Sequence, residues 1–232
     1  MSGWRVWVTR ASPGAHATAE RLRALGFEPA VAPLLEVRAI ASGPIDLTGI
    51  AALAFTSANG VAAFAARSVE RVLPVFTVGA ATAEAARSVG FASVVSADGD
   101  VEVLAPVIAA HGLSAGAVLH PGPAEPAGDL CAALAKLGVR ATRAVVYETV
   151  IRPLESAEVA RITGVDAVLL HSPKAARALA DWLGGVPARR PVAVCLSANV
   201  AAPVANAGLA VVLVAAEPTE AALLETLVEA RG

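Results

Sequence analysis

The chain has 232 residues, of which 56% are hydrophobic, and its formal net charge is −2. This length suits two small domains that each bury a core, and without a Lys/Arg cluster the chain lacks the basic surface that nucleic-acid binding requires. Its two cysteines, Cys131 and Cys195, provide neither a disulfide framework nor a metal-ligand set, so we expect a reducing compartment and no metal site.

The mean hydropathy of +0.64 raises the question of a membrane span. The longest uncharged stretch, residues 191–216, is interrupted by polar and helix-breaking residues such as Ser197 and Pro203, and it divides into strand, helix and strand. Near the N-terminus, the apolar run between Arg5 and Arg10 is too short for a signal sequence. We therefore expect a cytoplasmic protein with no membrane partner.

Short apolar runs rich in Val, Leu and Ala alternate along the chain with Ala-rich amphipathic stretches, a pattern typical of parallel sheets covered by helices. Asp100 and the pair Pro218-Thr219 stand where helices should begin, and glycines at positions 26, 90, 138 and 208 stand where helices should end. Strands are expected at residues 4–9, 30–33, 52–56, 75–79, 93–96, 117–120, 141–146, 166–171, 192–196 and 210–214. These strands predict two five-stranded sheets.

Three segments of the chain recur about 115 residues further along. The matching pairs are residues 53–57 with 168–172, 75–90 with 192–208, and 4–33 with 116–146. The recurrence predicts a duplicated block and hence two similar lobes, with chance similarity among Ala-rich helices as the alternative.

Two segments, Leu34–Ser42 and Tyr147–Pro153, have the extended character of connectors. A simple tandem of lobes would place the boundary near residue 111. If the two segments instead pair as an antiparallel ribbon, the middle of the chain forms one lobe and its two ends together form the other. The residues alone leave both arrangements open.

A series of short motifs runs in order along nearly the whole chain. They are Val8-Thr9-Arg10, Pro33-Leu34-Leu35-Glu36, Phe55-Thr56-Ser57 with Val61, Gly79 with Thr82-Ala83, Gly138 before Val145-Val146-Tyr147-Glu148-Thr149, Ser172-Pro173 and Pro218-Thr219. In this order and spacing they resemble the landmarks of the uroporphyrinogen-III synthase family.

The resemblance implies an α/β fold of two Rossmann-like or flavodoxin-like lobes, with parallel five-stranded sheets joined by a two-stranded β linker. It assigns residues 1–35 and 153–232 to a discontinuous first lobe, 43–146 to the second, and 36–42 with 147–152 to the linker. It implies a monomeric hydro-lyase of haem biosynthesis that closes hydroxymethylbilane to uroporphyrinogen III, with loss of water and inversion of ring D.

The resemblance also bears on cofactors and partners. No metal or organic cofactor is expected. The expected partner is a small molecule, a linear tetrapyrrole, and a transient contact with hydroxymethylbilane synthase, which supplies it, is left open.

The resemblance implies catalytic roles for two residues. Tyr147, the only tyrosine, corresponds to the family's cleft tyrosine, whose phenol can donate a proton to the departing hydroxyl. Thr82 corresponds to the family's cleft threonine and stands near a helix start, where its other role is that of a cap. For Tyr147 the alternative is an aromatic plug at a hinge.

A substrate with eight carboxylates would suit a basic cleft, which this chain lacks, but helix N-termini at the carboxyl ends of parallel strands also bind anions. We therefore expect the strand-to-helix turns at residues 10–13, 57–60, 80–83, 121–128, 172–175 and 197–200 to line a cleft. The expected substrate-binding residues are Arg10, Ser57, Asn59, Ala83, Ser172, Lys174, Ser197 and Asn199. Helix capping is the alternative for Ser57 and Asn59, and a solvated surface charge is the alternative for Arg10.

Other functions are weighed against this one. His120 and His171 end strands but lack the spacing of metal ligands. The turns at residues 120–123 and 197–199 depart from the family pattern, so the alternative is a degenerate synthase paralogue or another cytoplasmic, two-lobed small-anion binding or regulatory protein. A glycosyl or phosphoryl transferase is disfavoured, because residues 9–14 contain neither a P-loop nor GxGxxG.

Overall fold

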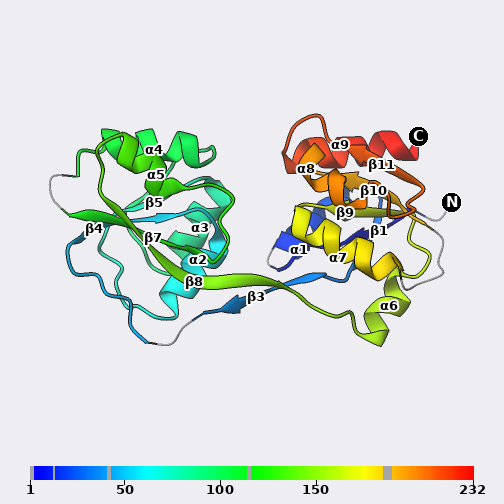
Figure 1. The fold of residues 1–232 in the computed structure, drawn as a ribbon, viewed down its shortest axis with the longest axis horizontal. Helices are drawn as coiled ribbons and strands as arrows, with labels where there is room; N and C mark the ends of the chain where they lie inside the picture. The colour runs from blue at the N-terminus through cyan, green and yellow to red at the C-terminus, as the bar shows by residue number, and fades with distance from the viewer. Residues whose placement is uncertain (1–2, 13, 41–42, 114–115, 185–189) are drawn as a thin grey trace. The chain divides into compact units, whose positions relative to one another are not determined.

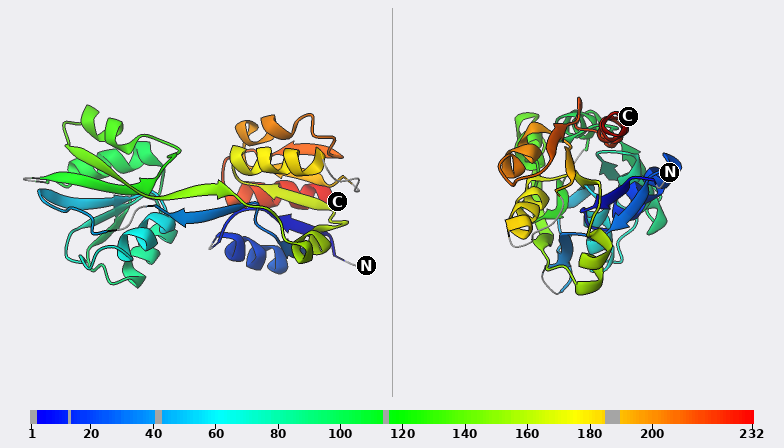
Figure 2. Two further views of the ribbon diagram at one scale, coloured as in Figure 1. Left: turned by 60° about the horizontal axis from the view of Figure 1, so that its bottom comes forward. Right: turned by 90° about the vertical axis from the view of Figure 1, so that its right-hand side faces the viewer.

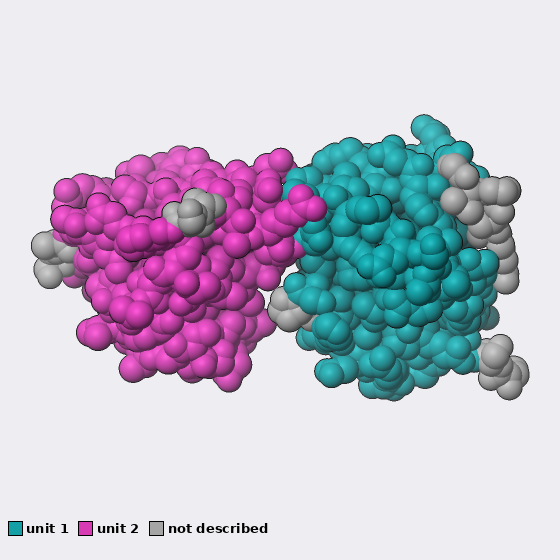
Figure 3. Space-filling view, turned by 90° about the horizontal axis from the view of Figure 1, so that it is seen from below, with its two compact units in different colours: residues 1–36, 150–232 teal, residues 37–149 magenta. Residues whose placement is uncertain are grey.

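The computed structural model describes residues 3–12, 14–40, 43–113, 116–184 and 190–232 (Figure 1). The chain forms two compact units (Figure 3). Unit 1 comprises Met1–Glu36 and Val150–Gly232, and unit 2 comprises Val37–Thr149. Residue 13 of the first expected turn and residues 41 and 42 of the expected linker lie outside the described residues. No helix of the described part is long and apolar enough to cross a membrane.

The sheet of unit 1 has five parallel strands in the order β11-β10-β9-β1-β2. Its strands are β1 (Arg5–Val8), β2 (Glu28–Val31), β9 (Ala167–Leu170), β10 (Val192–Cys195) and β11 (Val211–Val214). Successive residues of a strand face opposite sides of its sheet, and each side of this sheet has its own hydrophobic cluster. Trp7 packs in one cluster and its neighbours Val6 and Val8 in the other.

Helices cover both faces of this sheet, as the near-continuous apolar strands require (Figure 2). Residues of α6 (Ser156–Ile162), α7 (Pro173–Gly184), α8 (Ala198–Ala201) and the short 3₁₀ helix η1 (Ala202–Val204) pack in the cluster of Trp7. Residues of α1 (Gly14–Ala24) and α9 (Glu220–Arg231) pack in the opposite cluster.

The sheet of unit 2 has six strands in the order β3-β8-β7-β4-β5-β6. They are β3 (Leu35–Ala39), which begins in unit 1, and β4 (Ile50–Phe55), β5 (Val75–Thr77), β6 (Val94–Ser96), β7 (Ala117–Pro123) and β8 (Ala141–Ile151). α4 (Val101–Ala110) and α5 (Leu130–Lys136) pack with Ala52 and Ala54, whereas α2 (Ala58–Ala65) and α3 (Ala80–Ser88) pack with Leu53 and Phe55. Helices thus cover both faces here as well.

The two sheets match strand for strand, because β11-β10-β9-β1-β2 corresponds to β6-β5-β4-β7-β8. The correspondence pairs the same segments as the sequence repeat, with the chain order circularly permuted. In each sheet the strand order reverses at one place, between β9 and β1 in unit 1 and between β4 and β7 in unit 2. Open α/β sheets bind ligands at the carboxyl ends of the strands beside such a switch point.

The expected α/β class with two largely parallel sheets is confirmed, but the expected strand count of unit 2 is wrong. β8 does not stop at residue 146 and runs on to Ile151. β3 pairs with it, and the Ile40 N–H donates to the Val146 carbonyl at 3.0 Å. The sheet therefore gains a sixth strand from a segment that had been expected to lie outside both sheets.

The local signals for helix ends are confirmed in most places. Asp100 and Thr219 are N-caps whose side chains accept backbone N–H groups, and the glycines at positions 26, 90, 138 and 208 all have positive φ. The turn expected at residues 121–128 is partly wrong, because residues 121–123 belong to β7, where they pair with β8.

Candidate active site

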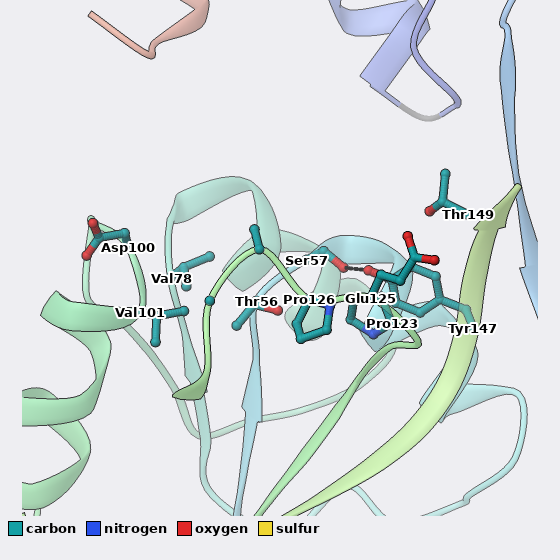
Figure 4. Close-up of a pocket in the computed structure, with 13 residues that line it drawn as sticks. Thr56, Ser57, Val78, Asp100, Val101, Pro123, Glu125, Pro126, Tyr147 and Thr149 are labelled. Atoms are coloured by element: carbon teal, nitrogen blue, oxygen red, sulfur yellow. Dashed lines mark hydrogen bonds between the residues drawn. The ribbon is translucent and has the colours of Figure 1, made fainter. Parts of the chain in front are cut away.

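A pocket of about 410 Å³ lies at the carboxyl ends of the strands of unit 2, beside its switch point (Figure 4). Its volume falls within the range typical of small-molecule sites. The lining residues are Thr56, Ser57, Val78, Gly99, Asp100, Val101, Pro123, Glu125, Pro126, Ala127, Gly128, Tyr147 and Thr149. No described lining residue is a Lys or Arg, so the walls offer apolar side chains, hydroxyls and carboxylates.

The side chains of Ser57 and Tyr147 meet in this pocket (Figure 4). The Tyr147 hydroxyl lies 2.8 Å from Ser57 Oγ, and either oxygen can donate the hydrogen bond. Ser57 is also the N-cap of α2, because its Oγ accepts the N–H of Gly60 at 3.2 Å. The serine therefore fixes the phenol of Tyr147 relative to the first turn of a helix.

A bulge explains how Tyr147 comes to face the pocket. In the pairing of β7 with β8, Gly122 lies opposite Val145, but Pro123 lies opposite Tyr147, so Val146 is an additional residue on β8. Val146 and Tyr147 are both buried, and the additional residue shifts the alternation of side chains along β8 by one position from Tyr147 onward. Bulges re-aim side chains in this way and are frequent beside active sites.

Tyr147 remains protonated in this setting. Burial raises the pKa of the Tyr147 phenol, and the hydrogen bond with Ser57 offsets only part of that rise. At neutral pH the phenol is therefore a donor, and it can give a hydrogen bond or a proton to a group in the pocket.

A second pair, His120 and Thr56, lies beside the first. His120 is 2% exposed, and its Nε2 lies 3.2 Å from the hydroxyl of Thr56, which lines the pocket. Burial, followed by the charge of Arg143, lowers the pKa of His120 to about 4, against an opposing effect of Asp129. The imidazole is therefore neutral at physiological pH, and it orients the Thr56 hydroxyl without adding charge.

The backbone around these two pairs is tightly packed. A Cβ on Gly60 would lie 2.7 Å from the carbonyl oxygen of Pro121, and one on Gly122 would lie 2.9 Å from His120 Nε2. Glycine at position 60 lets α2 approach β7 closely, and glycine at position 122 leaves room for the imidazole of His120, which contacts Thr56.

The other expected residues of unit 2 lie outside this lining. Asn59 is half-buried within α2, and Thr82 and Ala83 are buried within α3. Gly79 is the N-cap of α3, so the alternative role of Thr82, that of a cap, is wrong. Thr82 instead belongs to the first turn, where its N–H donates to the Gly79 carbonyl at 3.1 Å.

The expected residues of unit 1 lie at the carboxyl ends of its sheet. Arg10 Nη1 donates to Glu220 at 3.0 Å, and Ser172 Oγ accepts the Ala175 N–H at 3.2 Å, at the start of α7. Lys174 is half-buried, Asn199 is exposed and Ser197 is the N-cap of α8 without a side-chain cap bond.

Four pocket residues with polar side chains were not predicted as site residues. Thr56 directly follows β4, and Asp100 directly precedes α4. The rule that ligands bind at the carboxyl ends of the strands beside a switch point would have pointed to both residues. Glu125 lies in the turn at residues 121–128, which was expected to line a cleft, but it was not named as a site residue. Thr149 had no such signal, because β8 extends beyond its expected end. Among the described residues, no group of three or more His, Cys, Asp or Glu side chains could hold a metal ion.

Comparisons with known proteins point to one family. The family described as Uroporphyrinogen-III synthase HemD matches residues 16–225. The uroporphyrinogen-III synthetase of Helicobacter pylori 26695 has the same fold, with a TM-score of 0.67 and 20% identity over 99% of this chain and 100% of that chain. A mutant uroporphyrinogen III synthase from the extremely thermophilic bacterium Thermus thermophilus aligns with a TM-score of 0.48 and 15% identity over 99% of each chain. No curated protein sequence matches.

Proposed function

Because this chain belongs to the uroporphyrinogen-III synthase family, we propose that it closes hydroxymethylbilane to uroporphyrinogen III with loss of water and inversion of ring D. Family membership implies a tetrapyrrole substrate. The reaction class that follows is that of a hydro-lyase. The Ser57–Tyr147 pair in the pocket of unit 2 is the observation that carries the proposal.

The chemistry requires a proton at the hydroxymethyl group of the substrate. The C–O bond of that group breaks, and its electron pair leaves with the oxygen. The carbon that remains is cationic, and an electron pair of the adjacent pyrrole stabilises it. Hydroxide is a poor leaving group, so a proton from the Tyr147 phenol lets it depart as water. The cationic carbon is then bonded by the ring D carbon that already carries a bridge, which gives a spiro intermediate. The older bridge bond of that carbon breaks, and the released bridge carbon bonds to the free α-carbon of ring D, so ring D is inverted. The proton that this α-carbon loses restores the phenol.

The pocket lining suits pyrrole rings better than it suits carboxylates. Val78, Val101 and Pro126 offer apolar surface, while Asp100 and Glu125 carry carboxylates that can accept pyrrole N–H groups. Carboxylates of the substrate would be repelled by the same two residues. We therefore place the pyrrole that bears the leaving hydroxyl in the pocket and its acetate and propionate groups outside it.

Helix N-termini remain the proposed contacts for the substrate carboxylates. α2 and α3 begin at the carboxyl ends of β4 and β5 and have no acidic residue in their first turns. Their backbone N–H groups carry a partial positive charge. On this proposal, Asn59 on α2 and Thr82 on α3 act through the ends of their helices, outside the pocket.

The test is to supply hydroxymethylbilane, oxidise the products and separate the isomers. The proposal predicts type III isomer in excess over the type I isomer that forms without an enzyme. Type I alone, at the spontaneous rate, would eliminate the synthase function and favour a non-catalytic member of the family.

A further inference from the structure

A cluster of charged side chains lies at the carboxyl end of the sheet of unit 1. Glu220, the first residue of α9, is at its centre. One carboxylate oxygen, Oε2, accepts from Arg10 Nη1 and from His171 Nε2, each at 3.0 Å. The other, Oε1, accepts from the Thr18 hydroxyl at 2.6 Å and lies 3.9 Å from Arg21. Donors from three separate segments of the chain thus converge on one carboxylate.

The cluster occupies the place that corresponds to the pocket of unit 2. β9, β1 and β11 correspond to β4, β7 and β6. His171 follows β9 as Thr56 follows β4, and Glu220 begins α9 as Val101 begins α4. Thr56 and Val101 line the open pocket of unit 2. Unit 1 therefore places a carboxylate and its donors where a ligand would bind at a switch point.

From this geometry we propose that Arg10, Thr18 and His171 form a carboxylate-binding site whose resident ligand is the side chain of Glu220. Without that side chain, the site takes a small external carboxylate such as formate or acetate. In the native protein Glu220 is tethered to α9, so its effective concentration exceeds that of any carboxylate in solution and the site stays filled.

The burial and the hydrogen bonds of these donors favour a carboxylate as their partner. The side chains of His171 and Glu220 are only 9% and 15% exposed. His171 Nδ1 is buried and has no hydrogen-bond partner among the described residues, so the bond to Glu220 is the one that holds the ring. Arg10 folds over Gly14, where a Cβ would lie 2.6 Å from its Nε. The pKa of Glu220 agrees with this: burial would raise it, but the bonds from His171 and Thr18 outweigh that effect and lower it to about 2.

The site has a consequence for substrate selection. In the native protein Arg10 gives its Nη1 donor to Glu220, and only the remaining N–H groups of this 38% exposed side chain are left for a carboxylate of the substrate. The inference itself does not depend on the proposed reaction, because its readout is the stability of unit 1.

Chemical rescue of Glu220→Ala tests the proposal. All three tryptophans, Trp4, Trp7 and Trp182, belong to unit 1, so thermal unfolding followed by tryptophan fluorescence reports on this unit. The full chain would be melted in sodium formate, sodium acetate and sodium chloride at equal ionic strength. We expect formate and acetate to raise the melting temperature of Glu220→Ala by several degrees more than chloride does, and to leave the wild type at its chloride value.

Three further variants serve as controls. Glu225→Ala removes an exposed carboxylate from the same helix and should show no formate effect, and Glu220→Gln should show none because its side chain still fills the site. In Arg10→Ala/Glu220→Ala the rescue should be lost. Equal effects of formate and chloride on Glu220→Ala, or an equal formate effect on the wild type, would overturn the proposal. If Glu220→Ala does not fold in chloride, recovery of native fluorescence in formate supports the proposal, and failure to recover contradicts it.

Discussion

Tyr147 was expected to take part in catalysis because it belongs to a family motif. In the structure its hydroxyl is hydrogen-bonded to Ser57 Oγ. Replacing the phenol by Phe removes the proton donor and keeps the ring. General acids contribute roughly 10²- to 10⁴-fold to rates. Because the bilane loses its hydroxyl readily, we expect Tyr147→Phe to lower kcat by about 10- to 100-fold without abolishing turnover. Unchanged kcat in a steady-state assay would remove this residue from the mechanism.

The pH dependence of the reaction follows from the same group. The phenol must be protonated to donate, and burial raises its pKa above the ordinary value of 10.0. The contribution of Tyr147 should therefore persist from neutral pH up to that value and disappear only above it. The check is kcat against pH for the wild type and Tyr147→Phe. The two curves should run parallel up to about pH 10, and convergence already below pH 9 would contradict the assignment.

Glu220 gives a second prediction at the scale of the residue. Its pKa is lowered from 4.5 to about 2 on folding, so its contribution to stability is fully present above pH 4.5 and is lost as the pH falls towards 2. Allowing for solvent screening, we expect Glu220→Gln to cost on the order of 1–2 kcal/mol at pH 7. Urea unfolding followed by tryptophan fluorescence should show this difference shrinking between pH 5 and pH 3. A constant difference across that range would contradict the prediction.

At the scale of elements, α2 depends on the close approach of its first turn to β7. Gly60→Ala would place a Cβ 2.7 Å from the carbonyl oxygen of Pro121, and such overpacking typically costs about 1–3 kcal/mol. Gly184 is the last residue of α7, and no atom of the described residues lies within 4 Å of its Cβ position, so Gly184→Ala should be close to neutral. Thermal unfolding followed by circular dichroism compares the two variants. Equal melting temperatures would show that the approach is not as tight as the structure has it.

The elements also show what can be predicted from the sequence. Caps such as Asp100 and Thr219 act on N–H groups a few residues away, so their chemistry can be read locally. The pairing of β3 with β8 and the bulge at Val146 depend on segments far apart in the chain. No local sequence pattern predicts them. The same holds for the Arg10–Glu220 ion pair and for the Ser57–Tyr147 bond.

For the molecule as a whole, the repeat in the sequence corresponds to two sheets of matching strand order, each with its own hydrophobic clusters. Separate cores predict separate responses to mutation. Phe64 is fully buried in unit 2 and packs edge-on against Phe55, so Phe64→Ala should cost unit 2 about 3–5 kcal/mol. The midpoint followed by circular dichroism should fall, whereas the tryptophan transition of unit 1 should change little. An equal fall in both would show that the units unfold as one.

We propose that Ser57 and Tyr147 act together in catalysis in the pocket of unit 2. The most direct test is the rate of type III isomer formation by the wild type, Ser57→Ala, Tyr147→Phe and the double variant. Thr219→Ala, which removes the cap of α9 in unit 1, controls for the loss of a helix cap. We predict that the double variant is no slower than the slower single variant, because either change breaks the same bond. Losses that multiply, or a Tyr147→Phe enzyme as fast as the wild type, would contradict the claim.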